Sequence, residues 1–198
     1  ALSQRYPADQ VISIEECQQW DNAYADAMRA VHADFPEDFD VIALFAEAMM
    51  TRTPWKLWDI HRGEPSAGAD TLETLALLDT GLDLMLERGE APHPGILHMY
   101  IHALEMSPTP ERALKAANQL FELCPDVGHL QHMPAHIYVI CGQYEDAIRV
   151  SRKAITADDQ YVDFAGRYNF YTTSRCHDLH MMMYASMFAG QFEPAIQA

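Results

Sequence analysis

Apolar positions recur with helical periodicity along almost the whole chain. In the N-terminal part they recur every three or four residues after Ser13-Ile14-Glu15-Glu16, which has the Ser-x-x-Glu form of a helix-capping box. A break at Phe35-Pro36 separates this helix from a second one, which ends before Pro54. The pattern predicts an antiparallel helix pair over residues 12–52.

Residues 53–91 combine an irregular connection with a third helix. The connection holds Trp55 and Trp58 among several prolines and glycines, and Asp70-Thr71-Leu72-Glu73 then opens a helix that we expect to end near Arg88. No alternating strand pattern of useful length occurs. The sequence therefore predicts an all-α fold.

Residues 92–157 contain two copies of one helical segment. His98 corresponds to His132, and His102 to His136, each at an interval of 34 residues. That interval is the period of the tetratricopeptide repeat, in which each repeat is a pair of antiparallel helices. We therefore predict a tetratricopeptide-repeat-like, right-handed α-solenoid in which neighbouring repeats bury a common core.

A third copy is recognised by its ending. Gly142-Gln143-Tyr144 recurs as Gly190-Gln191-Phe192, an interval of 48 residues, which is 14 more than the repeat period of 34. We assign the extra residues to an insertion at 158–176 and the third repeat, which we expect to be truncated, to 177–198. Residues 1–198 are thus expected to form a single solenoid domain, whose exposed apolar ends would allow a homo-oligomer.

Composition and charge narrow the choice of partners. Asp and Glu outnumber Lys and Arg by 29 to 13, and the formal net charge of −16 argues against nucleic acid or an anionic membrane as a partner. The four cysteines are widely spaced and nothing at the N-terminus has the form of a signal peptide, so we expect reduced thiols and a cytoplasmic protein. No apolar run approaches the roughly 20 residues of a membrane-spanning helix. A cation or a neutral small molecule fits this composition better.

Histidines are concentrated in the repeated helices at spacings of three or four residues. Such spacings place imidazoles on one face of a helix, and the first helix of each tetratricopeptide repeat lines the inner groove. Imidazole is a common ligand of Cu, Fe and Zn. The sequence predicts a transition-metal site in this groove. Its candidate ligands are His98, His102, His129, His132, His136, His177 and His180.

Carboxylates and phenols accompany these histidines. Glu105 follows the second histidine of the first copy by three residues and is a candidate ligand or hydrogen-bond acceptor, and Asp178 is a second candidate carboxylate. A metal with an open coordination position would activate water or dioxygen, with Tyr100, Tyr138 or Tyr171 as nearby proton donors. The candidate catalytic residues are Tyr100, Tyr138 and Glu105.

Two other interpretations stay open. The histidines and tyrosines could form a hydrogen-bonded ladder that only stabilises the groove, because each buried ring without a partner would cost about 1–3 kcal/mol. Alternatively, the protein could be an adaptor that binds a peptide or protein partner without catalysis. Adaptors of this type usually present Lys, Arg and Asn, whereas this groove presents His, Tyr and Met. That difference favours a metal-dependent enzyme, of an oxidoreductase type, acting on a small organic molecule.

Two histidine-rich motifs also carry a resemblance. From Asp40 to the end, through His93-Pro94-Gly95 to Glu105 and through Gly128-His129-Leu130 to Tyr138, the chain resembles a family of tetratricopeptide-repeat-like proteins found in bacteria and fungi. The resemblance implies the repeat fold and a shared histidine site, but no particular reaction. Where relatives read Pro-His-Asn-x-His, this chain has Cys176-His177-Asp178-Leu179-His180. Asp178 would then be an added carboxylate ligand or a helix cap.

Overall fold

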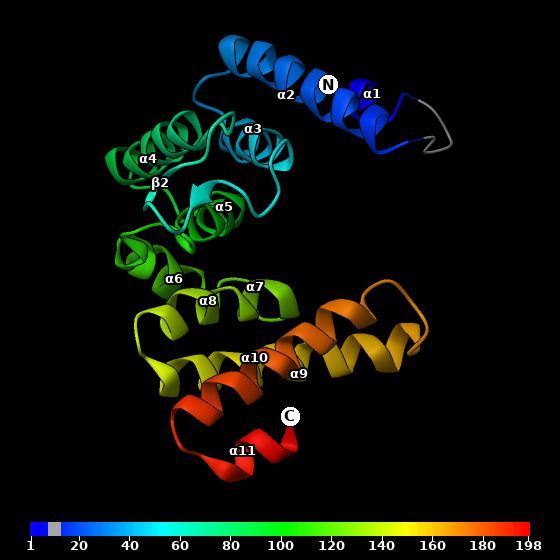
Figure 1. Cartoon of the computed structure of the whole chain (residues 1–198), viewed down its shortest axis with the longest axis vertical. Coiled ribbons are helices and arrows are strands. Elements are labelled where there is room, and N and C mark those ends of the chain that lie inside the picture. The colour runs from blue at the N-terminus through cyan, green and yellow to red at the C-terminus, as the bar shows by residue number, and fades with distance from the viewer. Residues whose placement is uncertain (8–12) are drawn as a thin grey trace. The chain divides into compact units, whose positions relative to one another are not determined.

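A computed structural model describes residues 1–7 and 13–198, and these residues are mostly helical (Figure 1). They form two compact units, unit 1 at Ala1–Pro108 and unit 2 at Thr109–Ala198. The expectation of an all-α fold agrees with this structure, whereas the single solenoid domain stays a prediction. Residue 12, with which the first helix pair was expected to begin, lies outside the described residues. No helix in the described part of the chain is both long and apolar enough to cross a bilayer.

Unit 1 consists of helices and one small hairpin. Its elements are α1 (Leu2–Arg5), α2 (Ile14–Asp34), α3 (Phe39–Thr51), β1 (Trp58–Asp59), β2 (Glu64–Pro65), α4 (Thr71–Arg88) and α5 (Pro94–Leu104). The predicted capping box does start α2, because the Ser13 hydroxyl accepts a hydrogen bond from the backbone N–H of Glu16 at 3.1 Å. The antiparallel strands pair Trp58 with Pro65. Strands of two residues leave no alternating pattern in a sequence, so the hairpin was not predicted.

The core of unit 1 is centred on α3, which packs against α2, α4 and α5. Ile42 and Met49 of α3, Leu78 of α4 and Ile101 of α5 are fully buried. A helix enclosed by three others has little surface left for polar side chains, which explains why α3 is apolar on most of its faces. Through this packing α3 and α5 are fixed beside each other.

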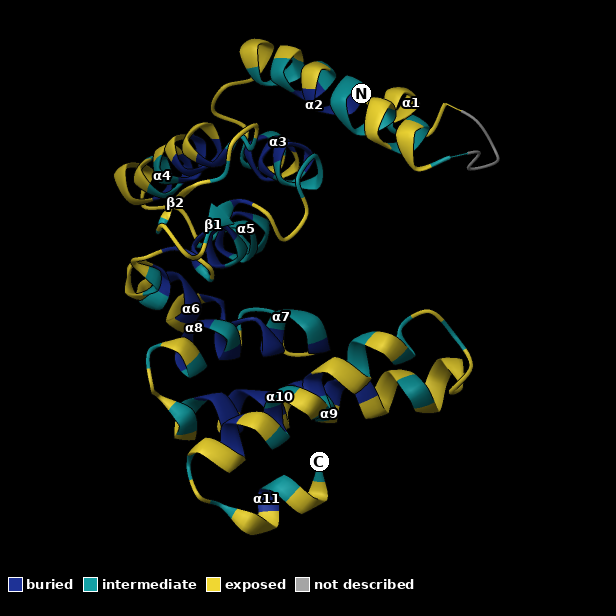
Figure 2. Cartoon of the chain, in the orientation of Figure 1, coloured by how far each residue is buried: buried dark blue, intermediate teal, exposed yellow. Residues whose placement is uncertain are grey.

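Unit 2 is assembled around α9. Its elements are a 3₁₀ helix η1 (Pro110–Ala113), α6 (Leu114–Leu120), α7 (Gly128–His132), α8 (Pro134–Ile140), α9 (Tyr144–Ala165), α10 (Thr172–Phe188) and α11 (Phe192–Gln197). Helices α7, α8 and α10 all pack on α9. Part of α9 is buried (Figure 2). Its buried residues include the small side chains of Ala147, Ser151 and Ala154, which allow these helices to approach closely.

The ends of α8 and α10 are structurally equivalent. Gly142 and Gly190 both have positive φ, at 75° and 68°. In each case the following glutamine closes the helix, with Gln143 N donating to Tyr138 O at 2.7 Å and Gln191 N to the carbonyl of Ser186 at 2.9 Å. This is the Schellman end that a left-handed glycine permits. The correspondence over 48 residues therefore reflects a repeated helix ending.

The residues assigned to an insertion, 158–176, lie in two helices and the connection between them. Helix α9 continues to Ala165, residues 166–171 make the connection, and α10 begins at Thr172. Because α9 and α10 pack against each other, the extra residues lengthen a helical hairpin (Figure 1). The exposed aromatic side chains of the segment lie near this turn.

Candidate metal centre

Two short helices bring His132 and His136 together. Pro134 has no backbone N–H to donate to the preceding turn, and the helix expected across this segment is divided at Met133 into α7 and α8. His132 ends α7, and His136 lies in the first turn of α8. Their rings are nearly perpendicular, with centroids 4.8 Å apart. The two Nε2 atoms are separated by 2.9 Å.

His177 of α10 completes what we call the histidine triad, with His132 and His136. Its Nε2 lies 3.4 Å from His136 Nε2, and its ring centroid is 4.6 Å from that of His132. One ligand nitrogen from each of the three lies within 4.8 Å of the others. In a tetrahedral site with bonds of about 2.0–2.1 Å, ligand nitrogens lie roughly 3.3 Å apart. The triad could therefore hold a metal ion with small adjustments of its side chains.

Burial changes steadily across the triad. His132 is fully buried, His136 is intermediate and His177 is exposed. One side of the triad is thus closed by protein while the other is open to solvent. Three protein ligands with an accessible fourth position are typical of catalytic metal sites, whereas structural sites are usually closed by four protein ligands.

A buried carboxyl group lies behind His132. Asp178 Oδ1 is 3.3 Å from His132 Nδ1, and both side chains are fully buried. An oxygen of this carboxyl group is placed to accept a proton from Nδ1, and the tautomer that carries its proton there leaves the Nε2 lone pair directed into the triad. Asp178 does not cap α10, whose N-cap is Tyr171. Its position is that of an acceptor that orients a ligand histidine.

A second buried acid, Asp158 of α9, adjoins Asp178. The burial of Asp178 and the negative charge of Asp158 raise the pKa of Asp178 to about 9. Asp158 Oδ1 accepts a hydrogen bond from the Tyr171 hydroxyl at 2.6 Å, and that hydroxyl accepts one from the backbone N–H of His129 at 3.3 Å. Burial and the bond to Asp158 raise the pKa of Tyr171, so the phenol stays protonated at neutral pH. Asp178 and Tyr171 therefore hold protons immediately behind the triad.

Gly128, the first residue of α7, is required by this arrangement. A Cβ atom at this position would lie 1.9 Å from Asp158 Oδ1 and 2.8 Å from the Tyr171 hydroxyl. Both distances are shorter than van der Waals contact. Only glycine allows α7 to pack this closely over the acid and the phenol.

Asp158 is the residue of the site that sequence reasoning missed. It continues the buried stripe of Ala147, Ser151 and Ala154 along α9 at helical spacing. A carboxylate in an apolar stripe is a signal that could have been noticed. Its partners, however, come from α7 and α10, so their identity required the tertiary structure.

The other predicted ligands of unit 2 lie outside the triad. The His129 ring stacks near that of His132, with centroids 6.4 Å apart. His180 is exposed, and its ring lies 6.4 Å from that of Tyr184, one turn further along α10. His177 therefore belongs to the triad, while His180 on the same helix is directed to Tyr184.

In unit 1, α5 carries the remaining predicted ligands. The ring centroids of His98 and His102 are 4.8 Å apart. His102 Nδ1 donates to Glu105 Oε1 at 2.9 Å, so this carboxylate does lie beside a histidine as expected. That these side chains share one site with the triad stays a prediction.

The hydroxyl groups of the two candidate catalytic tyrosines join neighbouring helices. Tyr100 donates to Asp79 Oδ1 of α4 at 2.9 Å, and Tyr138 donates to Asn118 Oδ1 of α6 at 2.6 Å. Burial raises the pKa of Tyr138. Both tyrosines are buried, with exposed fractions of 6% and 2%, so their catalytic role stays a prediction while their packing role is evident.

Comparison with known proteins gives no relative for this chain. No family model, no curated protein and no solved structure matches it. The resemblance to the tetratricopeptide-repeat-like family therefore rests on the motif residues alone. The geometry of the histidine triad is therefore the main evidence on the function of this protein.

Proposed function

We propose that unit 2 binds a divalent transition metal through His132, His136 and His177. The observation that carries the proposal is the convergence of their ring nitrogens, in which His136 Nε2 lies 2.9 Å from one partner nitrogen and 3.4 Å from the other. An imidazole nitrogen offers either one proton or one lone pair in the ring plane. One hydrogen bond can therefore account well for only one of the two contacts, whereas a metal ion between the rings accounts for both.

The donor set favours particular metals. Three imidazoles suit Zn²⁺ and Cu²⁺, while non-haem iron sites commonly add a carboxylate to two histidines. The carboxyl group of Asp178 lies at His132 Nδ1, on the opposite side of the ring from the triad. We therefore place Zn²⁺ and Cu²⁺ before iron among the candidate metals.

The finer proposal is a metal-dependent enzyme. A metal at the triad would supply Lewis acidity or redox chemistry to a small organic substrate, and an oxidoreductase reaction stays the favoured class. Its support is the exposure of His177, which makes this side of the triad accessible to solvent. Behind the site, Asp178 would orient His132, and protons would be held at Asp178 and Tyr171.

A second candidate, an adaptor without catalysis, is favoured by a different observation. Phe164, Tyr168 and Phe170, around the connection of α9 and α10, are 89%, 103% and 96% exposed. Exposed aromatic side chains close together in the chain are typical of surfaces that contact a peptide or protein. Partner binding by an adaptor would depend on these aromatic side chains and would not depend on the histidine triad.

Titration with Cu²⁺ or Co²⁺, followed by the ligand-field absorption of the metal, tests the metal proposal. His177→Ala removes a triad member, and His180→Ala is its matched control, because both residues are exposed histidines of α10. We expect His177→Ala to weaken binding by about 100-fold or more, since loss of even an orienting partner commonly costs 10–100-fold. His180→Ala should bind like the parent protein.

Two results would contradict the proposal. Equal weakening in the two variants would show that α10 binds metal only as an exposed histidine surface. No binding by a parent protein with intact helical circular dichroism would exclude the site, and the exposed aromatics would then be tested for peptide binding.

A further inference from the structure

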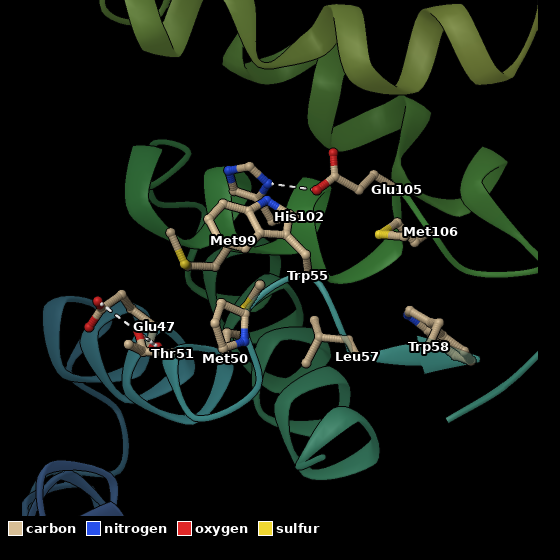
Figure 3. Close-up of a pocket in the computed structure, with 11 residues that line it drawn as sticks. Glu47, Met50, Thr51, Trp55, Leu57, Trp58, Met99, His102, Glu105 and Met106 are labelled. Carbon is tan, nitrogen blue, oxygen red and sulfur yellow. Dashed lines mark hydrogen bonds and ion pairs between the residues drawn. The ribbon is translucent and has the colours of Figure 1, made fainter. Parts of the chain in front are cut away.

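Unit 1 contains a pocket of about 220 Å³ between α3, the loop that follows α3, and α5 (Figure 3). Trp55, Trp58 and three methionines supply most of its apolar wall, while Glu47 and Glu105 supply carboxylates. A cavity of this size admits a small molecule and is too small for a folded peptide segment. It contains no member of the histidine triad.

The inner wall of the pocket is held in place by hydrogen bonds. The indole N–H of Trp58 donates to the carbonyl of Ala103 in α5 at 2.7 Å. The carbonyl of the neighbouring Leu57 accepts a bond from the Thr71 hydroxyl at 2.6 Å. The loop is thus tied to both α4 and α5. A wall that is already ordered loses little conformational entropy when a ligand binds.

Trp55 is unusual in both its exposure and its backbone conformation. Its side chain is 83% exposed, and its φ of 56° lies in the left-handed region, which is unfavourable for a bulky residue. Burial in the core does not explain a tryptophan here, and backbone preference opposes it. Strained residues of this kind are concentrated at binding and active sites. An indole ring at the edge of a ligand pocket explains both observations.

The charged groups of the pocket select for a cation. Of the residues described as lining it, two are glutamates, one is His102, which is bonded to Glu105, and none is lysine or arginine. The Thr51 hydroxyl donates to the backbone carbonyl of Glu47 at 2.8 Å and lies 3.1 Å from Glu47 Oε1, while Glu105 Oε1 accepts a hydrogen bond from His102 Nδ1 at 2.9 Å. The Glu105 carboxylate is therefore oriented by His102, and the Glu47 carboxylate has a hydroxyl beside it (Figure 3). Tryptophan faces attract ammonium groups, and the net charge of −16 adds long-range attraction.

We propose that this pocket binds a small organic cation, an alkylated ammonium group attached to an apolar or aromatic portion. The ammonium group contacts the tryptophan rings and the carboxylates, and the apolar portion packs against the methionine side chains. The site lies wholly within unit 1 and is independent of the metal centre, so either proposal can fail without the other.

Calorimetric titration with benzyltrimethylammonium tests the proposal. The neutral comparison is 2,2-dimethyl-3-phenylpropan-1-ol, in which carbon replaces the quaternary nitrogen and one methyl group carries a hydroxyl that keeps the compound soluble. We expect the cation to bind about tenfold more tightly, as a desolvated cation–π contact allows. Quenching of tryptophan fluorescence should follow the same isotherm in a Trp20→Phe background, because Trp20 is not part of the pocket.

Substitutions in the pocket provide the second test. Glu47→Gln should weaken binding of the cation severalfold and leave the neutral alcohol unaffected. Trp55→Gly should weaken binding of the cation about fivefold or more, yet keep or raise the melting temperature, because glycine accepts a positive φ without strain.

Three outcomes would overturn the proposal. Equal affinity for the cation and the alcohol would show an apolar pocket without charge selectivity. Unchanged affinity in Trp55→Gly would remove the tryptophan from the site. Absence of binding up to about 10 mM, by a parent protein with intact helicity, would exclude organic cations of this class.

Discussion

Replacing Gly128 with alanine should disrupt the packing behind the histidine triad. The added Cβ would lie 1.9 Å from Asp158 Oδ1, whereas an ordinary carbon–oxygen contact is about 3.3 Å or longer. Either the carboxylate or α7 must therefore move by more than about 1 Å. Asp158 is fully buried, so it cannot turn into solvent without opening the interface between α7 and α9.

The free energy of unfolding should fall by roughly 2–4 kcal/mol in Gly128→Ala. Overpacking costs about 1–3 kcal/mol, and the displaced carboxylate loses its hydrogen bond from Tyr171, which contributes about 1.5–3 kcal/mol because the acceptor is charged. The better helix propensity of alanine returns up to about 1 kcal/mol. Urea denaturation followed by circular dichroism measures the difference.

A double-variant cycle identifies the cause of the loss. In an Asp158→Ala background the clashing carboxylate is absent, so the additional cost of Gly128→Ala should fall below about 1 kcal/mol. A single variant Gly128→Ala within about 0.5 kcal/mol of the parent would refute the close packing of Gly128 on Asp158. A full additional loss in the double variant would refute the carboxylate as its cause.

Three further predictions concern the groups behind the triad and the metal. The pKa of Asp178 is raised from 3.8 to about 9, so between these values the folded metal-free protein keeps a proton that the unfolded chain has lost. The free energy of unfolding should therefore fall as the pH rises from about 4 to 9. Denaturation of Asp178→Asn should show a flatter pH dependence, and identical slopes in parent and variant would contradict this. Tyr171→Phe should lower the free energy of unfolding, measured in urea, by about 1.5–3 kcal/mol, because buried Asp158 loses the hydrogen bond from the phenol. A change smaller than about 0.5 kcal/mol would argue against that hydrogen bond. Zn²⁺ at about 100 times its dissociation constant should stabilise the parent protein by about 2.7 kcal/mol in thermal scans and leave a His132→Ala/His136→Ala variant unaffected. Equal stabilisation of the two proteins would indicate that Zn²⁺ binds elsewhere.

Much of the secondary structure could be predicted because its signals are local. The capping box at Ser13 and the left-handed glycines Gly142 and Gly190 act within a few residues of themselves. The division of the helix at Met133 was predictable in principle, since Pro134 is visible in the sequence and lacks the N–H that an unbroken helix needs. The helical spacing of the histidines on both sides of Pro134 nevertheless favoured a single unbroken helix.

The composition of the site was only partly predictable. The spacing of His132 and His136 correctly places them together, and the third member comes from α10 as expected. Residues three apart on a helix are separated by about 60° around its axis, which is enough to direct His177 into the triad and His180 to Tyr184. The roles of Asp178 and Asp158 depend on which helices pack together, and no local pattern encodes that choice.

The pocket of unit 1 illustrates the same limit. The tryptophan-rich connection was recognised as irregular, but its φ values and its anchoring to α4 and α5 depend on tertiary contacts. Glu105 and His102, which sequence reasoning assigned to a metal site, also line this pocket. The histidine motif thus identified two polar residues of this pocket, while the pocket around them depends on the tertiary structure.

Elemental analysis by plasma mass spectrometry of the protein, purified without an affinity tag, tests the metal centre most directly. Parent protein, His136→Ala and the control His180→Ala should be prepared side by side. We expect Zn or Cu in the parent and in His180→Ala, at a level that falls sharply in His136→Ala, because that residue contributes the nitrogen shared by both short contacts of the triad. A parent protein that carries no metal and takes up neither Zn²⁺ nor Cu²⁺ on reconstitution, while remaining helical, would contradict the metal centre.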